Sequence, residues 1–227
     1  FTDGFNCTNG SLTINSGVVT FTPLSSITAS TFESSTNDVR EITMNNVSVN
    51  LSQGSWILGG NNLIFNGTGS IITLGDNLGS ALFDGGNQTY GNLISPTATS
   101  LSMKSSASLS LLNILNSSSL FLDAGITIAV DSILGEGSCS SELTFEKFGN
   151  GANPVIQKTG FGDLSITGLR VINVNAITPG IAEVLYGNII GSSTGWTEGN
   201  GKFYWIGNSG EWGNGANWSF ESGGAFS

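Results

Sequence analysis

Short apolar runs separated by turn-forming residues fill the chain between residues 41 and 134. Within these runs apolar residues tend to alternate with small polar ones, as in Val47, Val49 and Leu51. A period of two is typical of a β-strand with one buried face. Gly, Asn and Asp interrupt the runs, and these residues tolerate the positive φ angles of tight turns. The pattern therefore predicts many short strands and no helix in this stretch.

Two folds fit short strands at regular spacing, a β-sandwich and a parallel β-solenoid. A solenoid stacks like residues on successive turns, which favours aliphatic residues inside, small polar residues at corners and few charges. Between Met44 and Leu134 the charged residues are Asp76, Asp84, Lys104, Asp123 and Asp131. We therefore expect an all-β, right-handed parallel β-helix over residues 1–195, with a β-sandwich as the alternative.

Three local features lead to separate expectations. Residues 33–41 form the most polar run of the chain and are predicted to be an exposed loop. Residues 109–115 crowd apolar side chains as a helix would, but they lack helix caps and charges, so we expect a strand. Tyr90 follows a polar turn and is expected on the outside or over a corner.

Residues 196–227 differ from the rest because they are rich in glycine and hold four of the five tryptophans, Trp196, Trp205, Trp212 and Trp218. A segment this short cannot bury a core of its own. We therefore expect a Trp/Gly-rich connector whose rings pack over the last turn of the solenoid or against a following module. Because exposed indoles also stack on sugars, a carbohydrate platform is the alternative.

The charge balance excludes some partners. Six basic residues stand against sixteen acidic ones, giving a formal net charge of −10. Nucleic-acid binding needs clustered Lys and Arg, so we expect no nucleic-acid partner. No window approaches the ~18 apolar residues of a membrane-spanning helix, so no direct membrane insertion is expected. The chain starts at Phe1 without Met or a signal peptide, which indicates a mature protein or an excised piece.

Cys7 and Cys139 are the only cysteines. At roughly 20 to 25 residues per turn and about 4.8 Å between turns, they would lie on the order of 25 Å apart. A disulfide needs Cα atoms within ~7 Å. We predict two free, mostly buried thiols.

Enzymatic chemistry has weak support in the sequence. The chain has no histidine, which removes Ser-His-Asp and Cys-His nucleophiles and His-based zinc sites. The Gly-rich segments lack the spacing of phosphate-binding loops. The nearest candidates for acid–base work on polysaccharides are Asp123, Asp131 and Asp163, with Lys147 or Arg170. These residues are isolated and stand in turn positions, so we expect no catalytic residues and no enzyme.

Three segments, 75–77, 83–87 and 122–125, supply oxygen atoms of the kind that bind calcium. None has the DxDxDG spacing of a known calcium loop. We expect no metal-binding residues and no cofactor.

The last third of the chain carries a recognisable combination of motifs. The segments are DLSITGLRVINVNAI (163–177), YGNIIGSSTGWT (186–197) and FYWIGNSGEWGNGANWSFESGG (203–224). They resemble the recurring unit of very large repetitive cell-surface proteins of Bacteroidota, including SprB-type gliding-motility adhesins. The tryptophan positions Trp196, Trp205, Trp212 and Trp218 carry the resemblance.

This resemblance implies export through type IX secretion and an extracellular location at the cell surface. It provides no catalytic residues. We therefore expect a non-enzymatic repeat module of a secreted adhesin, a stiff rod used in cell adhesion or gliding motility. Its expected partners are neighbouring modules of the same long chain and an extracellular surface or polysaccharide. A polysaccharide-binding or polysaccharide-cleaving β-helix, and a stalk with no ligand, are the alternatives.

Overall fold

The computed structural model describes residues 5–7, 10–75, 79–96, 100–114, 119–138, 141–199, 204–206 and 217–219. None of these segments forms a helix long and apolar enough to cross a membrane. In chain order the strands are β1 (Phe5–Cys7), β2 (Leu12–Thr13), β3 (Gly17–Thr20), β4 (Ser26–Ser34), β5 (Arg40–Thr43), β6 (Ser48–Leu58), β7 (Leu63–Leu74), β8 (Ser80–Asp84), β9 (Thr89–Ile94), β10 (Ser100–Met103), β11 (Ala107–Asn113), β12 (Ser119–Asp123), β13 (Thr127–Leu134), β14 (Leu143–Phe148), β15 (Val155–Lys158), β16 (Leu164–Thr167), β17 (Leu169–Ile172), β18 (Asn175–Ile177), β19 (Ala182–Leu185), β20 (Asn188–Ile190), β21 (Trp196–Gly199), β22 (Tyr204–Trp205) and β23 (Trp218–Ser219).

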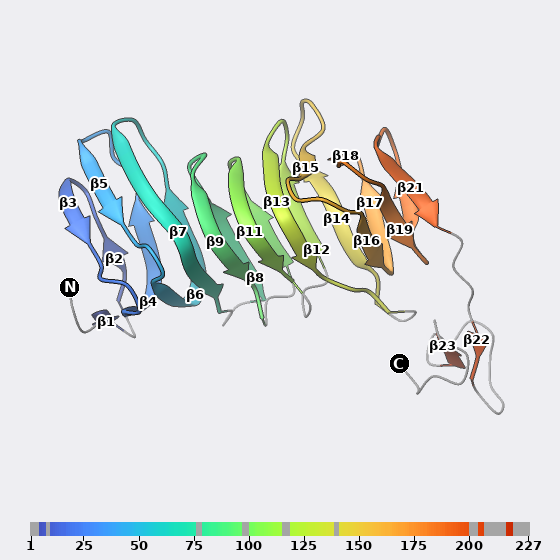
Figure 1. The fold of residues 1–227 in the computed structure, drawn as a ribbon, viewed down its shortest axis with the longest axis horizontal. Coiled ribbons are helices and arrows are strands. Elements are labelled where there is room, and N and C mark those ends of the chain that lie inside the picture. The colour runs from blue at the N-terminus through green and yellow to red at the C-terminus, as the bar shows by residue number, and fades with distance from the viewer. Residues whose placement is uncertain are drawn as a thin grey trace.

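The strands stack into a rod, a parallel β-solenoid of about eight turns (Figure 1). Each strand from β1 to β21 pairs in parallel with a strand one turn earlier or later, as in the ladder of β12 on β10. The predicted solenoid is confirmed. The β-sandwich alternative is wrong, because a sandwich needs antiparallel neighbours, and among the described strands only β22 and β23 pair that way.

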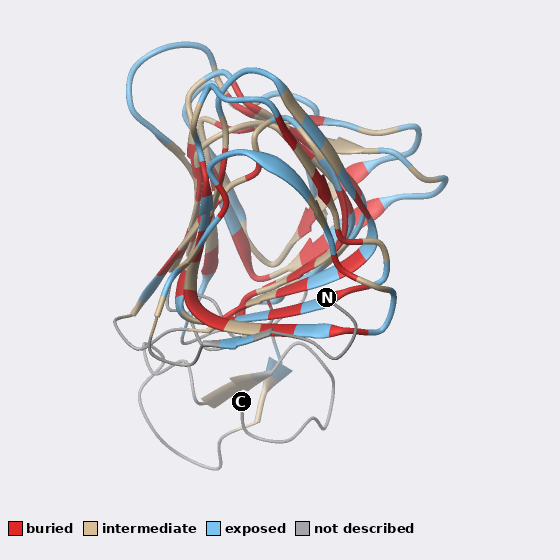
Figure 2. Ribbon diagram, turned by 90° about the vertical axis from the view of Figure 1, so that its left-hand side faces the viewer, coloured by how far each residue is buried: buried red, intermediate tan, exposed pale blue. Residues whose placement is uncertain are grey.

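Each turn crosses three walls, which meet at corners when the rod is viewed from its N-terminal end (Figure 2). Wall 1 contains residues 26–29, 48–51, 71–74, 92–94, 111–113 and 132–134. Wall 2 contains residues 31–34 and 55–58 and then β8, β10, β12, β14, β17 and β20. Wall 3 contains β3, β5, residues 63–66, the first halves of β9, β11 and β13, then β15 and β18.

Turn length varies while the strand register is kept. Trp56 pairs with Phe83, 27 residues later, whereas Arg170 pairs with Asn188, 18 residues later. The difference is taken up in the corner loops, since the strands of one wall stay paired. An inward residue in one turn therefore stays above an inward residue in the next.

Inward side chains form one continuous apolar core. In the first turns it is aromatic: the Phe32 and Trp56 rings stack with centroids 4.1 Å apart and planes 12° from parallel. The edge of Tyr90 meets Trp56 at 5.9 Å. At the far end of the rod the edge of Trp196 meets Phe145 at 6.4 Å. Trp196 belongs to strand β21 of the last turn itself, so it does not test the expected packing of connector rings over that turn.

Two expectations about polar groups are wrong. Tyr90 is buried, because its hydroxyl finds partners inside: it donates to Gly85 O at 2.8 Å and accepts from Trp56 Nε1 at 3.3 Å. The loop expected over residues 33–41 is shorter: residues 35–39 lie between β4 and β5 and most of them are exposed, but Arg40 lies in β5 and has no exposed surface. Its guanidinium donates to Thr36 O, Thr36 Oγ1 and Gly59 O, which ties the corners of two successive turns together.

The predictions for residues 109–115, for the connector and for the two cysteines have different outcomes. Residues 107–113 form a strand, as expected for most of the 109–115 stretch. Strand β21 pairs with β19, so residues 196–199 belong to the last turn. The connector over residues 196–227 stays a prediction, because residues 200–203, 207–216 and 220–227, including Trp212, lie outside the described residues. The thiol predictions for Cys7 and Cys139 also fall on side chains that are not described.

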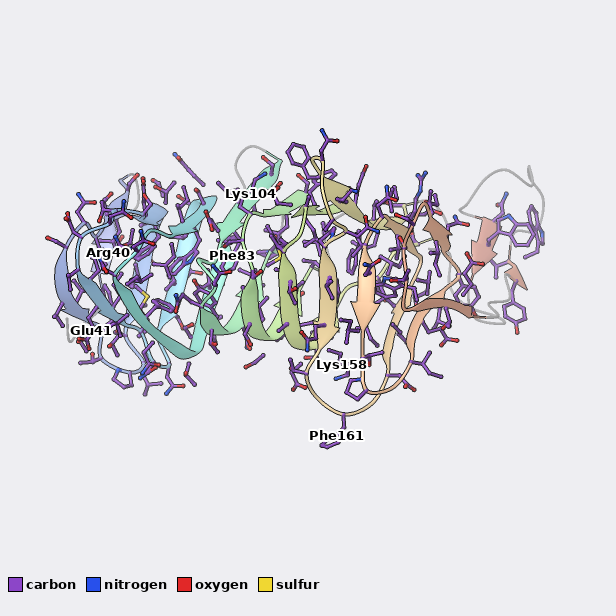
Figure 3. The ribbon with its side chains drawn as sticks, turned by 90° about the horizontal axis from the view of Figure 1, so that it is seen from above. Arg40, Glu41, Phe83, Lys104, Lys158 and Phe161 are labelled. Atoms are coloured by element: carbon purple, nitrogen blue, oxygen red, sulfur yellow. The ribbon has the colours of Figure 1, made fainter. Side chains whose placement is uncertain are left out.

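We predict that Trp56→Ala lowers the free energy of unfolding by about 3–5 kcal/mol, since it removes the largest ring of the core. Phe161→Ala is the control, because this side chain is 99% exposed at a loop tip (Figure 3). Its effect should stay within about 0.5 kcal/mol. Urea unfolding of both variants measures this, and wild-type stability in Trp56→Ala would contradict the packing.

Tyr90 gives a pH prediction. Burial raises the pKa of its hydroxyl, and nearby Asp84 adds to this effect. The folded-state pKa is above the unfolded value of about 10, so the Tyr90 contribution to stability is present below pH ~10 and is lost as pH rises further. We expect wild type and Tyr90→Phe to show equal tyrosinate absorbance until alkaline unfolding begins. Gradual ionisation of Tyr90 near pH 10 in the folded protein would contradict its burial.

Candidate functional site

The outward side chains of wall 1 form a surface that continues through six turns of the rod. The runs that build it alternate in sequence, for example Val47-Ser48-Val49-Asn50-Leu51, so every second residue points outward. Val49 and Leu51 are buried, whereas Ser48 and Asn50 are exposed. The period-two pattern thus places polar and apolar residues on opposite sides of the wall.

Strand register arranges these outward residues in two straight columns, which we call the outer face of wall 1. One column runs Ser26, Ser48, Ile71, Asn92, Leu111, Ser132. The other runs Thr28, Asn50, Thr73, Ile94, Asn113, Leu134. Neighbours within a column are one turn apart, about 4.8 Å.

From the third of these turns onward, aliphatic and polar residues alternate on the outer face both within a turn and along each column. Each turn presents one aliphatic and one polar residue, and the aliphatic residue changes column from turn to turn. The aliphatic positions are Ile71, Ile94, Leu111 and Leu134, and the polar positions are Thr73, Asn92, Asn113 and Ser132. Ile71 and Leu134 are exposed by 37% and 44%, so parts of these side chains are available for contact.

The two columns contain no charged residue. Among the described charges of the same turns, Glu33, Asp84 and Asp123 belong to wall 2, Glu41 belongs to wall 3, and Asp131 stands at the corner that precedes wall 1. Covering an uncharged surface costs less solvation free energy than burying an unpaired carboxylate, provided that its polar groups find hydrogen bonds. In a chain of net charge −10, the outer face of wall 1 is therefore suited to close contact.

The carboxylates considered for catalysis are not brought together. Asp123 pairs with Lys104 at 2.9 Å, on the side of the rod where Figure 3 labels Lys104. Asp131 stands at the corner before wall 1 and lies 3.8 Å from Lys158 Nζ. Asp163 accepts a hydrogen bond from Ile181 N at 2.8 Å. Each carboxylate is thus engaged in holding a different corner.

The two basic candidates, Lys147 and Arg170, also have positions of their own and are not paired with these carboxylates. Lys147 Nζ donates to Gly151 O and to Asn153 Oδ1, both at 3.2 Å, within its own turn. Arg170 lies on wall 2, in register with Thr144 and Asn188. The structure therefore forms no acid–base pair from these five residues.

The segments considered for calcium have other partners. Asp84 Oδ1 accepts a 2.5 Å hydrogen bond from Ser105 Oγ, and Asp123 is in its ion pair with Lys104. Residues 76 and 77 lie outside the described part of the chain. Among the described residues no group of three His, Cys, Asp or Glu side chains gathers at one point.

The C-terminal tryptophans fall into two groups. Trp196 is 8% exposed, and its Nε1 donates to Val174 O at 3.0 Å, so it closes the end of the core. Trp205 and Trp218 meet edge to face at 5.3 Å across the β22–β23 pair. Trp196 is therefore a structural residue of the solenoid, whereas Trp205 and Trp218 contact each other in the separate β22–β23 pair.

Comparisons with known proteins give no relative for the chain: no family model, curated protein or solved structure matches it. The resemblance to SprB-type units stays a prediction from the motifs.

Two consecutive residues of wall 1, one with its side chain outward and one with its side chain inward, should respond differently to substitution by lysine. Ile94→Lys should change the free energy of unfolding by less than about 1 kcal/mol, because Ile94 points outward. Leu93→Lys should unfold the protein, because Leu93 has no exposed surface and a lysine there would bury an unpaired charge. Circular dichroism and urea unfolding compare the two, and equal losses would contradict the assigned directions.

Proposed function

We propose that the chain is a non-enzymatic module of a secreted cell-surface adhesin, a stiff rod that holds the outer face of wall 1 against an extracellular polysaccharide or other neutral surface. Adhesion is its activity, and the neighbouring modules of a longer chain are its structural partners. The two-column, uncharged outer face of wall 1 carries this proposal.

The chemistry of the outer face supports a neutral polysaccharide as the contacted surface. Amide groups such as those of Asn50 and Asn92 both donate and accept hydrogen bonds, as sugar hydroxyls require. Aliphatic residues such as Ile71 and Leu134 cover the C–H faces of sugar rings without desolvating a charge. A polyanionic surface is disfavoured, since the chain is itself acidic.

The shape supports adhesion by repetition. Every contact on the outer face recurs at each turn, because the turns are held in register by parallel strand ladders. Weak contacts repeated along one rod, and along several rods joined in one chain, give an avidity far above that of a single contact. No deep pocket is required for this mode of binding.

The extracellular location, type IX export, gliding motility and a source among the Bacteroidota rest on the C-terminal motif alone. Trp196 and the Trp205–Trp218 pair hold three of the four tryptophan positions of that motif. These parts of the proposal are open to a direct check, because further copies of the tryptophan motif should occur in the same gene.

Adhesion of coated beads tests the proposal. Beads carrying the wild-type chain should bind films of neutral polysaccharide, and a four-residue wall 1 variant should bind at least tenfold fewer. Its substitutions are Ile71→Lys, Ile94→Lys, Leu111→Lys and Leu134→Lys. A wall 2 variant with the same change in charge should bind like wild type. Its substitutions, all at outward positions of wall 2, are Ile57→Lys, Leu82→Lys, Phe121→Lys and Ile172→Lys.

Two results would contradict the proposal: wild-type beads that bind no neutral surface, or equal binding by the wall 1 and wall 2 variants. The same films also address the alternative of polysaccharide cleavage. Release of soluble sugar by the wild-type chain would replace adhesion with an enzymatic function.

A further inference from the structure

The loop between β14 and β15, residues 149–154, is longer than the loops of the neighbouring turns at the same corner of the rod. The corresponding loops are residues 124–126 in the turn before and residues 173–174 in the turn after. Strand β14 pairs with β12 and β17, and β15 pairs with β13 and β18, so both ends of the loop are fixed. The additional residues therefore project beyond the corner (Figure 1).

Hydrogen bonds hold this loop on both sides of its tip. The carbonyl oxygens of Phe148 and Ala152 accept hydrogen bonds from backbone N–H groups of the preceding turn, at 3.0 and 2.9 Å. Lys147 Nζ donates to Gly151 O at 3.2 Å. Asn150 and Gly151 lie between the two backbone anchors, and both are exposed. No described residue accepts a hydrogen bond from Gly151 N.

An asparagine that is followed by glycine can react with its own backbone. The glycine nitrogen attacks Cγ of the asparagine, so an N–Cγ bond forms, the bond from Cγ to the side-chain amide nitrogen breaks, and ammonia leaves with the backbone proton. The product is a cyclic succinimide. Water then opens the ring at one of its two carbonyl groups and leaves either aspartate or isoaspartate. Nothing is oxidised or reduced, and water is the only co-reactant.

Gly151 meets the steric requirement of this reaction. Its φ is +131°, which a glycine adopts readily because it has no Cβ. Apart from its chain neighbours, the one described atom within 4 Å of the place where a Cβ would stand is Ala124 Cβ, at 3.3 Å. Asn150 is exposed to the water that opens the ring. The glycine nitrogen is thus approachable, and the second reactant is present.

The same dipeptide occurs at Asn66-Gly67, where the fold protects it. Asn66 pairs with Thr43 in the ladder with β5, and Gly67 pairs with Tyr90 in the ladder with β9. Gly67 is also buried. The side chain of Asn66 cannot reach the nitrogen of Gly67 for attack without breaking these ladders. Three further pairs include residues outside the described part of the chain: Asn9-Gly10, Asn200-Gly201 and Asn214-Gly215.

We propose that Asn150 is a site of spontaneous deamidation, at which the chain converts asparagine to isoaspartate and aspartate and releases ammonia. Each conversion adds one negative charge at the corner between walls 2 and 3. Isoaspartate also lengthens the backbone by a methylene group, but Asn150 lies in a loop outside the strands, so the solenoid stays folded. This corner therefore acquires a charge that increases with the age of the chain, whether or not the rod is an adhesin.

Peptide mapping of the full chain during incubation in warm, neutral buffer tests the proposal. Trypsin cleaves after Lys147 and Lys158, and the released peptide contains Asn150 and Asn153. Asn153 precedes Pro154, whose nitrogen has no proton to lose, so it forms no succinimide by this route. Digestion under mildly acidic conditions stops the reaction. Mass spectrometry should then locate conversion at Asn150, and chromatography should separate isoaspartate from aspartate.

In the folded chain, conversion at Asn150 should be at least tenfold faster than at Asn66. Asn150→Gln should remove the conversion from the tryptic peptide over the same period, because glutamine would have to form a larger ring. The converted chain should keep the melting temperature of the starting material.

Unfolding the same chain in urea separates the effect of the structure from that of the dipeptide. Without the ladders of β7, Asn66 should react at a rate comparable with that of Asn150. No conversion at Asn150, equal conversion at Asn66 and Asn150 in the folded chain, or a lower melting temperature after conversion would overturn the proposal.

Discussion

Hydrogen bonding in register between parallel strands of successive turns is the constraint on which this structure depends. It fixes each residue directly above its partner one turn away, so an inward position stays inward along the whole rod. The aromatic stack of Phe32 and Trp56 and the outer columns of wall 1 are two results of the same register. Corner loops can then differ in length without disturbing core or surface.

The same constraint explains where contact surface is found. Because the interior is filled by side chains, the proposed contact surface is a wall of the rod, and its area grows with the number of turns. On wall 1 that area is neutral, whereas the carboxylates of this acidic chain are used at corners and on the other walls, as Asp123 is with Lys104.

Alternation of apolar and polar residues was enough to predict the solenoid, because the period of two and the scarcity of charge are local properties. Polar residues with buried partners were not predictable. Arg40 and Tyr90 are inside because Gly59 O, Gly85 O and Trp56 accept or donate there, and two of these partners are distant in sequence: Gly59 is 19 residues from Arg40 and Trp56 is 34 residues from Tyr90. The sequence shows the residues of the outer face of wall 1 only as separate short runs. Which of them stand above one another depends on the strand register, and the register depends on the length of every loop.

Spin-label distances along one wall 1 column test the central claim most directly. With one label fixed at position 132, labels at 71, 48 and 26 are three, four and five turns away, or about 14, 19 and 24 Å between backbones. The account predicts a rise of about 4.8 Å for each turn added. Distances that do not increase in this order would contradict the parallel, in-register stack.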